Sequence, residues 1–312
     1  MQQTTNSILM VRPIDFRMNE QTAVNNYYQQ ELSNMLPAAI NAKAQQEFDA
    51  LVLKLQNSGV NVIVVEDTKK PNTPDAIFPN NWISFHQNGD IALYPMFAKN
   101  RRLERREDVL EVLEEKGFLI ENVLDYTEAE EFDVFLEGTG SMILDRKQRK
   151  AYCALSPRAD EELFIEFCED FEFTPVIFTA NQTVNNHREA IYHTNVMMCV
   201  AEEFAVVCLA SIDDKKERKN LVKHLKESNK EIIDISEEQV NSFAGNMLQV
   251  KGKDNQHFLV MSSSAYHSLR KDQLQKIEKY NPIIYSSLET IETCGGGSAR
   301  CMMAEVFLPK TS

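Results

Sequence analysis

A run of glycines lies between two cysteines near the C-terminal end of the chain. Gly295, Gly296 and Gly297 are consecutive, with Cys294 before them and Cys301 after them. Glycine lets the backbone approach a small substrate with no Cβ in the way. A thiolate is a strong nucleophile when its surroundings favour ionisation. The loop therefore predicts a nucleophilic cysteine, and its spacing alone leaves open which of the two cysteines that is.

Two further stretches supply the other groups that thiol catalysis needs. Residues 136–141 place Glu137 on a glycine turn, and residues 191–197 place His193 and Asn195 two positions apart, on one face of an extended segment. Each signal is weak alone, because a lone histidine is usually a satisfied polar residue and Glu-Gly is usually a turn. Together they provide an acid/base, an orienting carboxylate and a nucleophile.

The elements that must position these groups repeat along the chain. A pattern of strand, strand, helix, strand returns every 50–70 residues or so, with no linker rich in Pro, Gly or Ser between units. Loops of such units would converge on a shared centre, where a pocket forms. The expected strands are 60–65, 82–85, 91–94, 118–124, 141–144, 151–155, 175–179, 231–235, 247–250, 258–261 and 282–285, and the expected helices are 101–116, 159–170, 214–228 and 264–279.

Composition excludes several classes of protein. The 312 residues carry a net charge of −14, which argues against nucleic-acid binding. No apolar run approaches a membrane span, and residues 1–7 do not resemble a secretory signal. The six cysteines lack the short repeated spacing of a zinc site or a disulfide framework. We expect a cytoplasmic protein with reduced thiols and no membrane or nucleic-acid partner, and homo-oligomerisation is left open.

The order of these motifs resembles the guanidine-modifying or pentein superfamily. Its pattern is an Asp-x-x-Phe stretch, here at Asp75, then Glu-Gly-x-Gly, then His-x-Asn, then a glycine run and a cysteine. The superfamily includes arginine deiminases, dimethylarginine dimethylaminohydrolases and glycine amidinotransferases. Over almost the whole chain the sequence is also similar to citrulline-utilisation hydrolases. The resemblance implies a pentein fold, a fivefold pseudo-symmetric α/β propeller of ββαβ units, in one catalytic domain covering residues 1–312.

The resemblance also implies a role for each candidate residue. The nucleophile of the family follows the glycines and begins an apolar strand, which favours Cys301 over Cys294. His193 would be the general acid/base and Glu137 its orienting carboxylate. An amino-acid substrate would be held at its α-amino group by Asp75 and at its carboxylate by arginine forks. The arginines expected there are Arg158 and either Arg101 or Arg102, although helix-start surface charges would explain the same residues.

Three asparagines depart from the pattern of relatives that process guanidinium. Asn80 and Asn81 stand where those relatives have carboxylates, and Asn195 stands where they commonly have Asp. Burying a guanidinium cation without an anion is costly, whereas a neutral ureido group suits the donor and acceptor of an amide. We therefore expect citrulline as substrate, giving ornithine, ammonia and carbon dioxide with no cofactor or metal. The simpler explanation is that Asn80 and Asn81 form a turn after Pro79.

Two other functions compete with this one. An arginine deiminase or amidinotransferase would act on a guanidinium substrate, and the three asparagines speak against it. The pentein fold also occurs as a non-enzymatic ribosome anti-association factor. The presence of Cys301, His193 and Glu137 at family positions, together with the acidic net charge, argues against such a binding module.

Overall fold

Five three-stranded sheets with one shared connection pattern form the body of the computed structural model, which describes residues 1–311. In each sheet the central strand pairs antiparallel with one neighbour and parallel with the other. Parallel strands need a crossover connection, and a helix provides it in every unit. This arrangement is the predicted pentein fold of ββαβ units.

The five units are these, with their strands in the order antiparallel, central, parallel and then their crossover helices: β17 (Ala304–Glu305), β1 (Ser7–Arg12), β2 (Asn61–Glu66) and α1 (Pro37–Asn57); β3 (Ile83–Phe85), β4 (Asp90–Leu93), β5 (Asn122–Asp125) and α2 (Glu107–Glu115); β6 (Met142–Asp145), β7 (Lys150–Leu155), β8 (Thr174–Thr179) and α4 (Glu161–Asp170); β11 (Met198–Val200), β12 (Phe204–Val207), β13 (Glu231–Asp234) and α6 (Lys215–Glu227); β14 (Leu248–Lys251), β15 (His257–Ser262), β16 (Ile283–Ser286), α8 (Ser263–Ser268) and α9 (Lys271–Glu278).

The first unit is completed by residues from both ends of the described chain. Strand β17 runs antiparallel to β1, with Leu9 opposite Ala304. Both residues are buried in one apolar cluster that also contains Trp82. Because β17 follows the glycine loop, this pairing ties the segment that carries Cys301 to the N-terminal strand.

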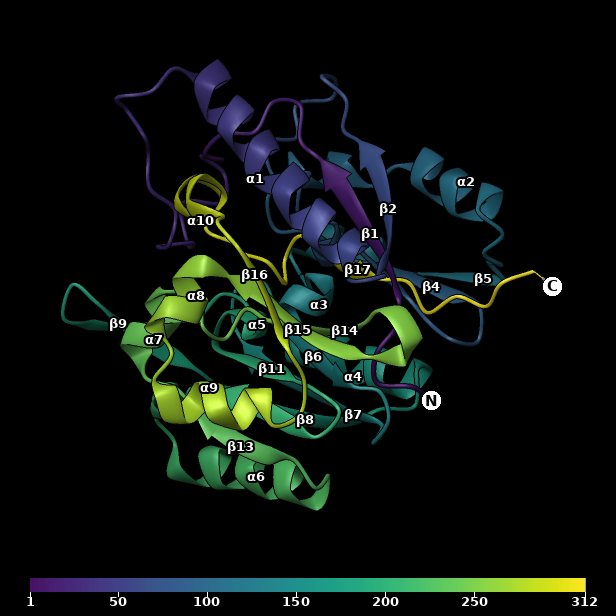
Figure 1. Ribbon diagram of the computed structural model, residues 1–312. Helices are drawn as coiled ribbons and strands as arrows, with labels where there is room; N and C mark the ends of the chain where they lie inside the picture. Colours follow the sequence, from purple (N-terminus) through teal and green to yellow (C-terminus); the bar gives the residue numbers. More distant parts are fainter. Residues whose placement is uncertain (312) are drawn as a thin grey trace.

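Short helical turns stand between the units, close to the centre of the molecule. They are α3 (Gly138–Ser141) and α5 (Thr194–Met197), which contact each other, and α10 (Glu289–Gly295), which leads into the glycine loop. Figure 1 shows α3 and α5 near the middle of the ribbon, whereas α2, α6 and α9 lie towards its rim. Residues that precede the first strand of each unit therefore face a common centre.

Several local predictions were wrong. The segment 101–116 is not one helix, because a 3₁₀ turn at Arg101–Glu104 precedes α2, and 264–279 forms two helices. His193 is extended, but α5 begins at the next residue, so His193 and Asn195 do not share one face of a strand. Cys301 lies in a turn rather than at a strand start. Two or three polar residues are enough to close a helical turn, which the hydrophobic period cannot register.

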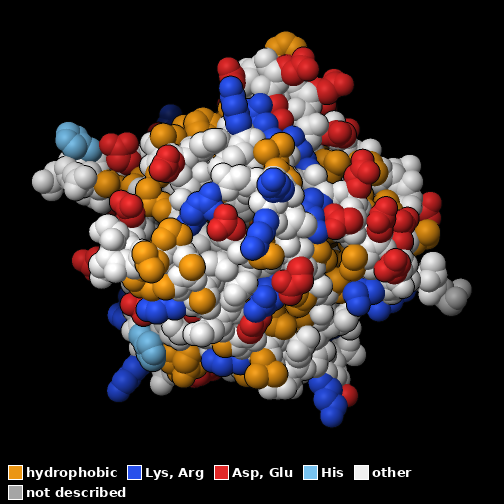
Figure 2. Space-filling view, turned by 90° about the horizontal axis from the view of Figure 1, so that it is seen from above, with side chains coloured by type: hydrophobic (Ala, Val, Ile, Leu, Met, Phe, Trp, Pro, Cys, Tyr) orange, Lys and Arg blue, Asp and Glu red, His pale blue; other side chains and the backbone are white. Residues whose placement is uncertain are grey.

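Two segments lie outside the five units. One is the hairpin of β9 (Asn181–Val184) and β10 (His187–Ala190), and the other is the largely irregular stretch 13–36, while α7 (Glu237–Asn241) is a short helix leading towards β14. On the face seen in Figure 2, Lys and Arg side chains are interspersed with Asp and Glu. Within residues 1–311, no helix has the length and apolar character needed to cross a membrane.

We predict that Gly245→Ala destabilises the protein, because the new Cβ would lie 2.4 Å from the carbonyl oxygen of Val196. Overpacking of this kind costs about 1–3 kcal/mol in the free energy of unfolding. Chemical denaturation would measure the loss, with the exposed helical substitution Ala39→Ser as the control. Equal stability of the two variants would mean that the backbone of the fourth unit yields freely.

Candidate active site

A hydrogen bond between His193 and Glu137 forms the core of the candidate site. Nε2 of His193 lies 2.7 Å from Oε2 of Glu137, and both side chains are buried. Each residue immediately precedes a short helical turn, α5 or α3, and those turns contact each other. The carboxylate fixes the imidazole tautomer with the proton on Nε2, which leaves Nδ1 as the basic nitrogen.

Burial sets the protonation states of this pair. Burial lowers the pKa of His193 to about 4, although the hydrogen bond and the charge of Glu137 oppose that shift. Burial alone would raise the pKa of Glu137, but Arg158 and the hydrogen bond from His193 hold that pKa well below its usual range. At neutral pH the pair is therefore a neutral imidazole on an ionised carboxylate, which is the state that a general base requires.

Two buried arginines balance the charge of this carboxylate. Nη1 of Arg158 donates to Oε2 of Glu137 at 3.4 Å, and Nη1 of Arg101 lies 4.0 Å from the same oxygen. Arg101 also makes a two-pronged pair with Glu104, with both distances 2.9 Å, and lies 3.9 Å from Asp75. Desolvated charges of this kind are stable only when each has a partner.

Cys301 lies in the turn after the glycine loop, and its sulfur faces two side-chain amides. Nδ2 of Asn246 lies 3.2 Å from Sγ and Nδ2 of Asn195 lies 3.4 Å from it. The side chain of Arg300 does not face the sulfur, because it donates to the carbonyl of Met303 and to Glu305. The neighbouring arginine, one possible source of positive charge beside the thiol, is therefore turned away.

A small cavity joins these groups. Asp75, Asn81, Arg101, Arg158 and other residues line it, and its volume is about 10 Å³, the space of about one water molecule. An amino acid does not fit a space of this size, so the site must open to admit one. The remaining lining residues are Thr22, Asn26, Phe78, Tyr192, His193, Gly295, Gly296, Gly297 and Cys301.

Residues 19–30 cover the cavity, which sequence analysis did not predict. Nδ2 of Asn19 donates to Asp75 at 2.7 Å, and Thr22 accepts from Arg158 through its carbonyl at 3.0 Å. Asn26 donates to the carbonyl of Gly295 at 3.3 Å. Because polar contacts hold this segment down, water and substrate polar groups can replace them when it lifts.

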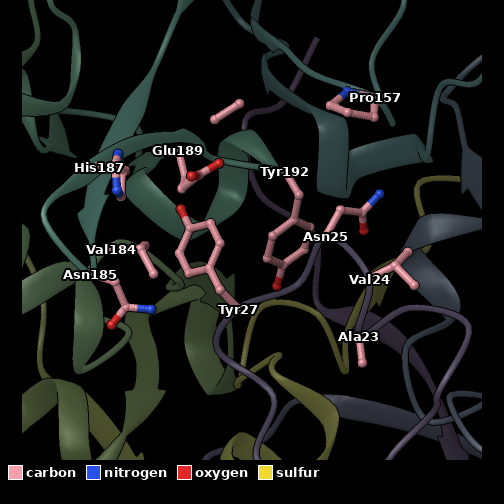
Figure 3. Close-up of a pocket in the computed structure, with 11 residues that line it drawn as sticks. Ala23, Val24, Asn25, Tyr27, Pro157, Val184, Asn185, His187, Glu189 and Tyr192 are labelled. Carbon is pink, nitrogen blue, oxygen red and sulfur yellow. The ribbon is translucent and has the colours of Figure 1, made fainter.

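A larger cavity lies on the other side of Tyr192. Its volume is about 360 Å³, and it lies between the segment that carries Asn25 and Tyr27 and the β9–β10 hairpin, which contributes Glu189 (Figure 3). Tyr192 lines both cavities. The space beside the closed site is therefore large enough for a free amino acid, with one aromatic ring between it and Cys301.

The structure brings most of the predicted site residues together, but not all. Asn80 is buried outside the cavity lining and donates to Thr139, and Arg102 turns away to the carbonyl of Met96 and to Glu130. The expectation that Arg102 reaches the substrate is not supported by this placement. Cys294 does not line the cavity either, and burial raises the pKa of its thiol.

Asn246 is the residue of the site that sequence analysis missed. It follows Gly245 in a stretch that resembles an ordinary turn, and nothing in its spacing relates it to the histidine or the cysteines. The available signal was its position, because Asn246 stands two residues before β14 just as Asn81 stands two residues before β3. Comparing equivalent positions in the repeated units would have found it.

One group of side chains elsewhere has a metal-like arrangement. Among residues 1–311, ligand atoms of Glu202, Glu203 and His257 lie within 4.8 Å of one another. Glu202 already pairs with Lys147 at 2.6 Å, and His257 shares a hydrogen bond with Thr4. The group does not line the cavity with Cys301, and it adds no group to the chemistry of that site.

Fold and site define a protein of the guanidine-modifying superfamily, with a cysteine, a histidine and a carboxylate at the centre of a pentein fold. The chain belongs to the family described as N,N-dimethylarginine dimethylhydrolase, eukaryotic, whose model matches residues 12–308. No curated protein matches the chain.

Solved structures support the same fold. The chain is 17% identical to apo ArgZ, an arginine dihydrolase from the ornithine–ammonia cycle in cyanobacteria, with a TM-score of 0.75, 98% of this chain covered and 41% of ArgZ. The N-terminal domain of ArgZ bound to product matches at 17% identity and a TM-score of 0.70, over 97% of this chain and 99% of that domain. A dimethylarginine dimethylaminohydrolase adduct with S-methyl-L-thiocitrulline matches at 13% identity and a TM-score of 0.61, over 96% and 98%. The chain thus spans less than half of full-length ArgZ.

We predict that kcat/KM keeps its neutral-pH value down to about pH 5 and is lost towards pH 4, because protonation of His193 removes the base. The pKa of His193 is lower in the folded protein than the 6.5 of a free histidine, so the unfolded chain binds the proton first. Stability should therefore also fall as pH decreases from 6.5 towards 4. An acidic limb at pH 6.5 in the kcat/KM profile would contradict the buried neutral imidazole.

Glu137→Gln removes the carboxylate that orients His193 and should lower kcat/KM by about 10²–10⁴-fold, since the amide does not fix the required tautomer. A pH profile of this variant should stay depressed across the neutral range. His187→Gln, on the exposed β10 strand, is the control and should leave kcat/KM unchanged.

Proposed function

We propose that the protein is a cysteine-dependent hydrolase that cleaves C–N bonds at the terminal carbon of an arginine-like side chain. The observation that carries this proposal is the convergence of Cys301, His193 and Glu137 on one buried cavity. Nucleophile, base and orienting carboxylate are the groups that covalent thiol hydrolysis needs. Residues 1–312 would act as one catalytic domain.

The proposed reaction needs only residues of this chain. His193 accepts the thiol proton, and the thiolate of Cys301 attacks the terminal carbon to form a C–S bond. His193 then returns its proton to the departing amino group, which leaves as ammonia when the C–N bond breaks. For a ureido substrate, a thiocarbamate remains on the enzyme. Water activated by His193 cleaves the C–S bond, and the released carbamate decomposes to ornithine and carbon dioxide.

A neutral ureido group fits the hydrogen bonds of the site, and this supports citrulline as the substrate. Oδ1 of Asn81 accepts from Arg101 at 2.9 Å, so its NH₂ group must point the other way. Among residues 1–311 that NH₂ has no hydrogen-bond partner, although Asn81 is buried and lines the cavity. A ureido oxygen can accept from it, whereas a guanidinium offers only further donors.

A guanidinium substrate is the second candidate, and the comparisons favour it more than they favour citrulline. ArgZ is an arginine dihydrolase, and the matching family is that of dimethylarginine hydrolases. The buried charges allow a cation as well, because three carboxylates face two arginines. The acids are Asp75, Glu104 and Glu137, and the bases are Arg101 and Arg158.

The charge count does not decide between the two substrates. Burial raises the pKa of Glu104 to about 8, against the effect of Arg101, so the excess negative charge lies between zero and one at neutral pH. The fixed donor of Asn81 does discriminate. Leaving a buried donor against another donor costs about 1–3 kcal/mol, which corresponds to about a 5–150-fold preference for the ureido group.

The ends of the substrate would be held by other residues of the cavity. Oδ1 of Asp75 has no hydrogen-bond partner within residues 1–311, and it is suited to an α-amino group. Arg158 and Arg101 line the same cavity and could turn part of their forks towards an α-carboxylate. We propose these pairings together with a cytoplasmic location, and sedimentation in solution would determine whether the protein is a homo-oligomer.

We predict that purified protein releases ornithine and ammonia from citrulline, and that Cys301→Ser lowers the rate by about a thousandfold or more. Product analysis should use citrulline and arginine in parallel. Ornithine formed from arginine would establish a dihydrolase, and citrulline formed from arginine a deiminase; either result would overturn the ureido proposal and keep the thiol mechanism. Full activity of Cys301→Ser would remove the proposed nucleophile.

Asn81→Asp should shift the ratio of kcat/KM for citrulline to that for arginine by about tenfold or more towards arginine, because a carboxylate replaces the fixed N–H donor. Asn80→Asp is the matched control, since the same change one residue earlier lies outside the cavity lining and should leave the ratio unaltered. An equal shift in both variants would mean that net charge, not the amide of Asn81, selects the substrate.

A further inference from the structure

Asn246 is held in one orientation by two backbone groups. Its Oδ1 accepts from the N–H of Arg300 at 3.0 Å, and its Nδ2 donates to the carbonyl of Asn195 at 3.0 Å. Turning the amide over would place donor against donor and acceptor against acceptor. The group that faces the sulfur of Cys301 at 3.2 Å is therefore an N–H donor.

The second amide at the sulfur is less constrained. Asn195 has Nδ2 at 3.4 Å from Sγ and Oδ1 at 3.8 Å from the same sulfur, so both ends of its amide are within reach. Asn246 differs because its N–H cannot be exchanged for an oxygen. Of these two residues, it is Asn246 that presents the sulfur with a fixed donor.

The backbone before Asn246 is adapted to this approach. A Cβ at Gly245 would lie 2.4 Å from the carbonyl oxygen of Val196, so only glycine allows this close contact between the fourth and fifth units. The contact brings Asn246 under the turn that carries Arg300 and Cys301. One side chain thus holds both the sulfur and the backbone of the nucleophile's turn.

We propose that Asn246 is a further catalytic residue, which stabilises negative charge on the sulfur of Cys301 through its fixed N–H and positions the sulfur for attack. This inference rests on the proposed function, since it takes Cys301 as the nucleophile. It assigns to a neutral amide the task that a neighbouring cation performs in other thiol sites, and Arg300 is turned away. The negative charge arises when His193 accepts the thiol proton, and it is consumed when the C–S bond forms.

Two substitutions separate this role from a structural one. Asn246→Asp keeps the shape and the acceptor for the N–H of Arg300, but it places a carboxylate oxygen against the sulfur. Asn246→Ala removes both groups and adds no charge. A structural role predicts that the alanine variant is the more impaired, whereas the proposed role predicts that the aspartate variant is.

The measurement is the rate at which iodoacetamide modifies Cys301 at neutral pH, followed by peptide mass spectrometry on the full chain. We expect Asn246→Asp to react at least about tenfold more slowly than the unmodified protein, with Asn246→Ala between them, and kcat to fall in the same order. Asn281→Asp is the matched control, because Asn281 is also a buried asparagine but pairs with Gln249 and does not line the cavity. It should lose stability without slowing the reaction of Cys301.

The outcomes distinguish this inference from the proposed function. Fast modification of Cys301 that is unchanged in both Asn246 variants overturns the role of Asn246 and leaves the nucleophile in place. A Cys301→Ser variant with full activity overturns the nucleophile whatever Asn246 does. If Asn246→Asp does not fold, as judged by thermal unfolding, the alanine variant decides alone, and an unchanged rate in it rejects the proposal.

Discussion

The fully buried carboxylate of Glu137 is the charge on which the site depends. Its stability requires His193, Arg158 and Arg101, which come from different parts of the repeated fold. Removing one of these partners leaves an uncompensated buried charge, which costs about 3–5 kcal/mol. The same network that orients the imidazole therefore also fixes how the second, third and fourth units meet. Catalytic geometry and the stability of the centre are one constraint.

This constraint explains why the site is closed by polar contacts rather than by an apolar lid. Asp75 and Arg158 each need partners whenever substrate is not there to pair with them, and Asn19 and Thr22 supply those partners. Substrate and the segment 19–30 would then compete for the same charged groups. Closing costs little, because the hydrogen bonds lost by one are regained by the other.

The sequence was sufficient for the residues that sit in recognisable motifs and for the type of fold, and insufficient where geometry decides. Cys301, His193 and Glu137 meet as expected, but the choice between Arg101 and Arg102 depended on a short 3₁₀ turn, in which adjacent side chains point about 120° apart. Asn246 had no motif at all. Its function comes from the contact of the fourth and fifth units, and no local pattern within either unit contains that information.

Repetition of the unit explains why these separate residues converge. Asn81 and Asn246 each stand two residues before the first strand of a unit, and Asn195 and Cys301 each stand three residues before one. In the third unit the position two before β6 is Gly140, where a Cβ would lie 2.4 Å from Nδ2 of Asn81 and 2.8 Å from Nδ1 of His193. Five similar loops cannot all carry side chains into one small centre. The third unit contributes glycine there, because only an absent side chain lets the amide of its neighbour and the basic nitrogen of His193 occupy the same place.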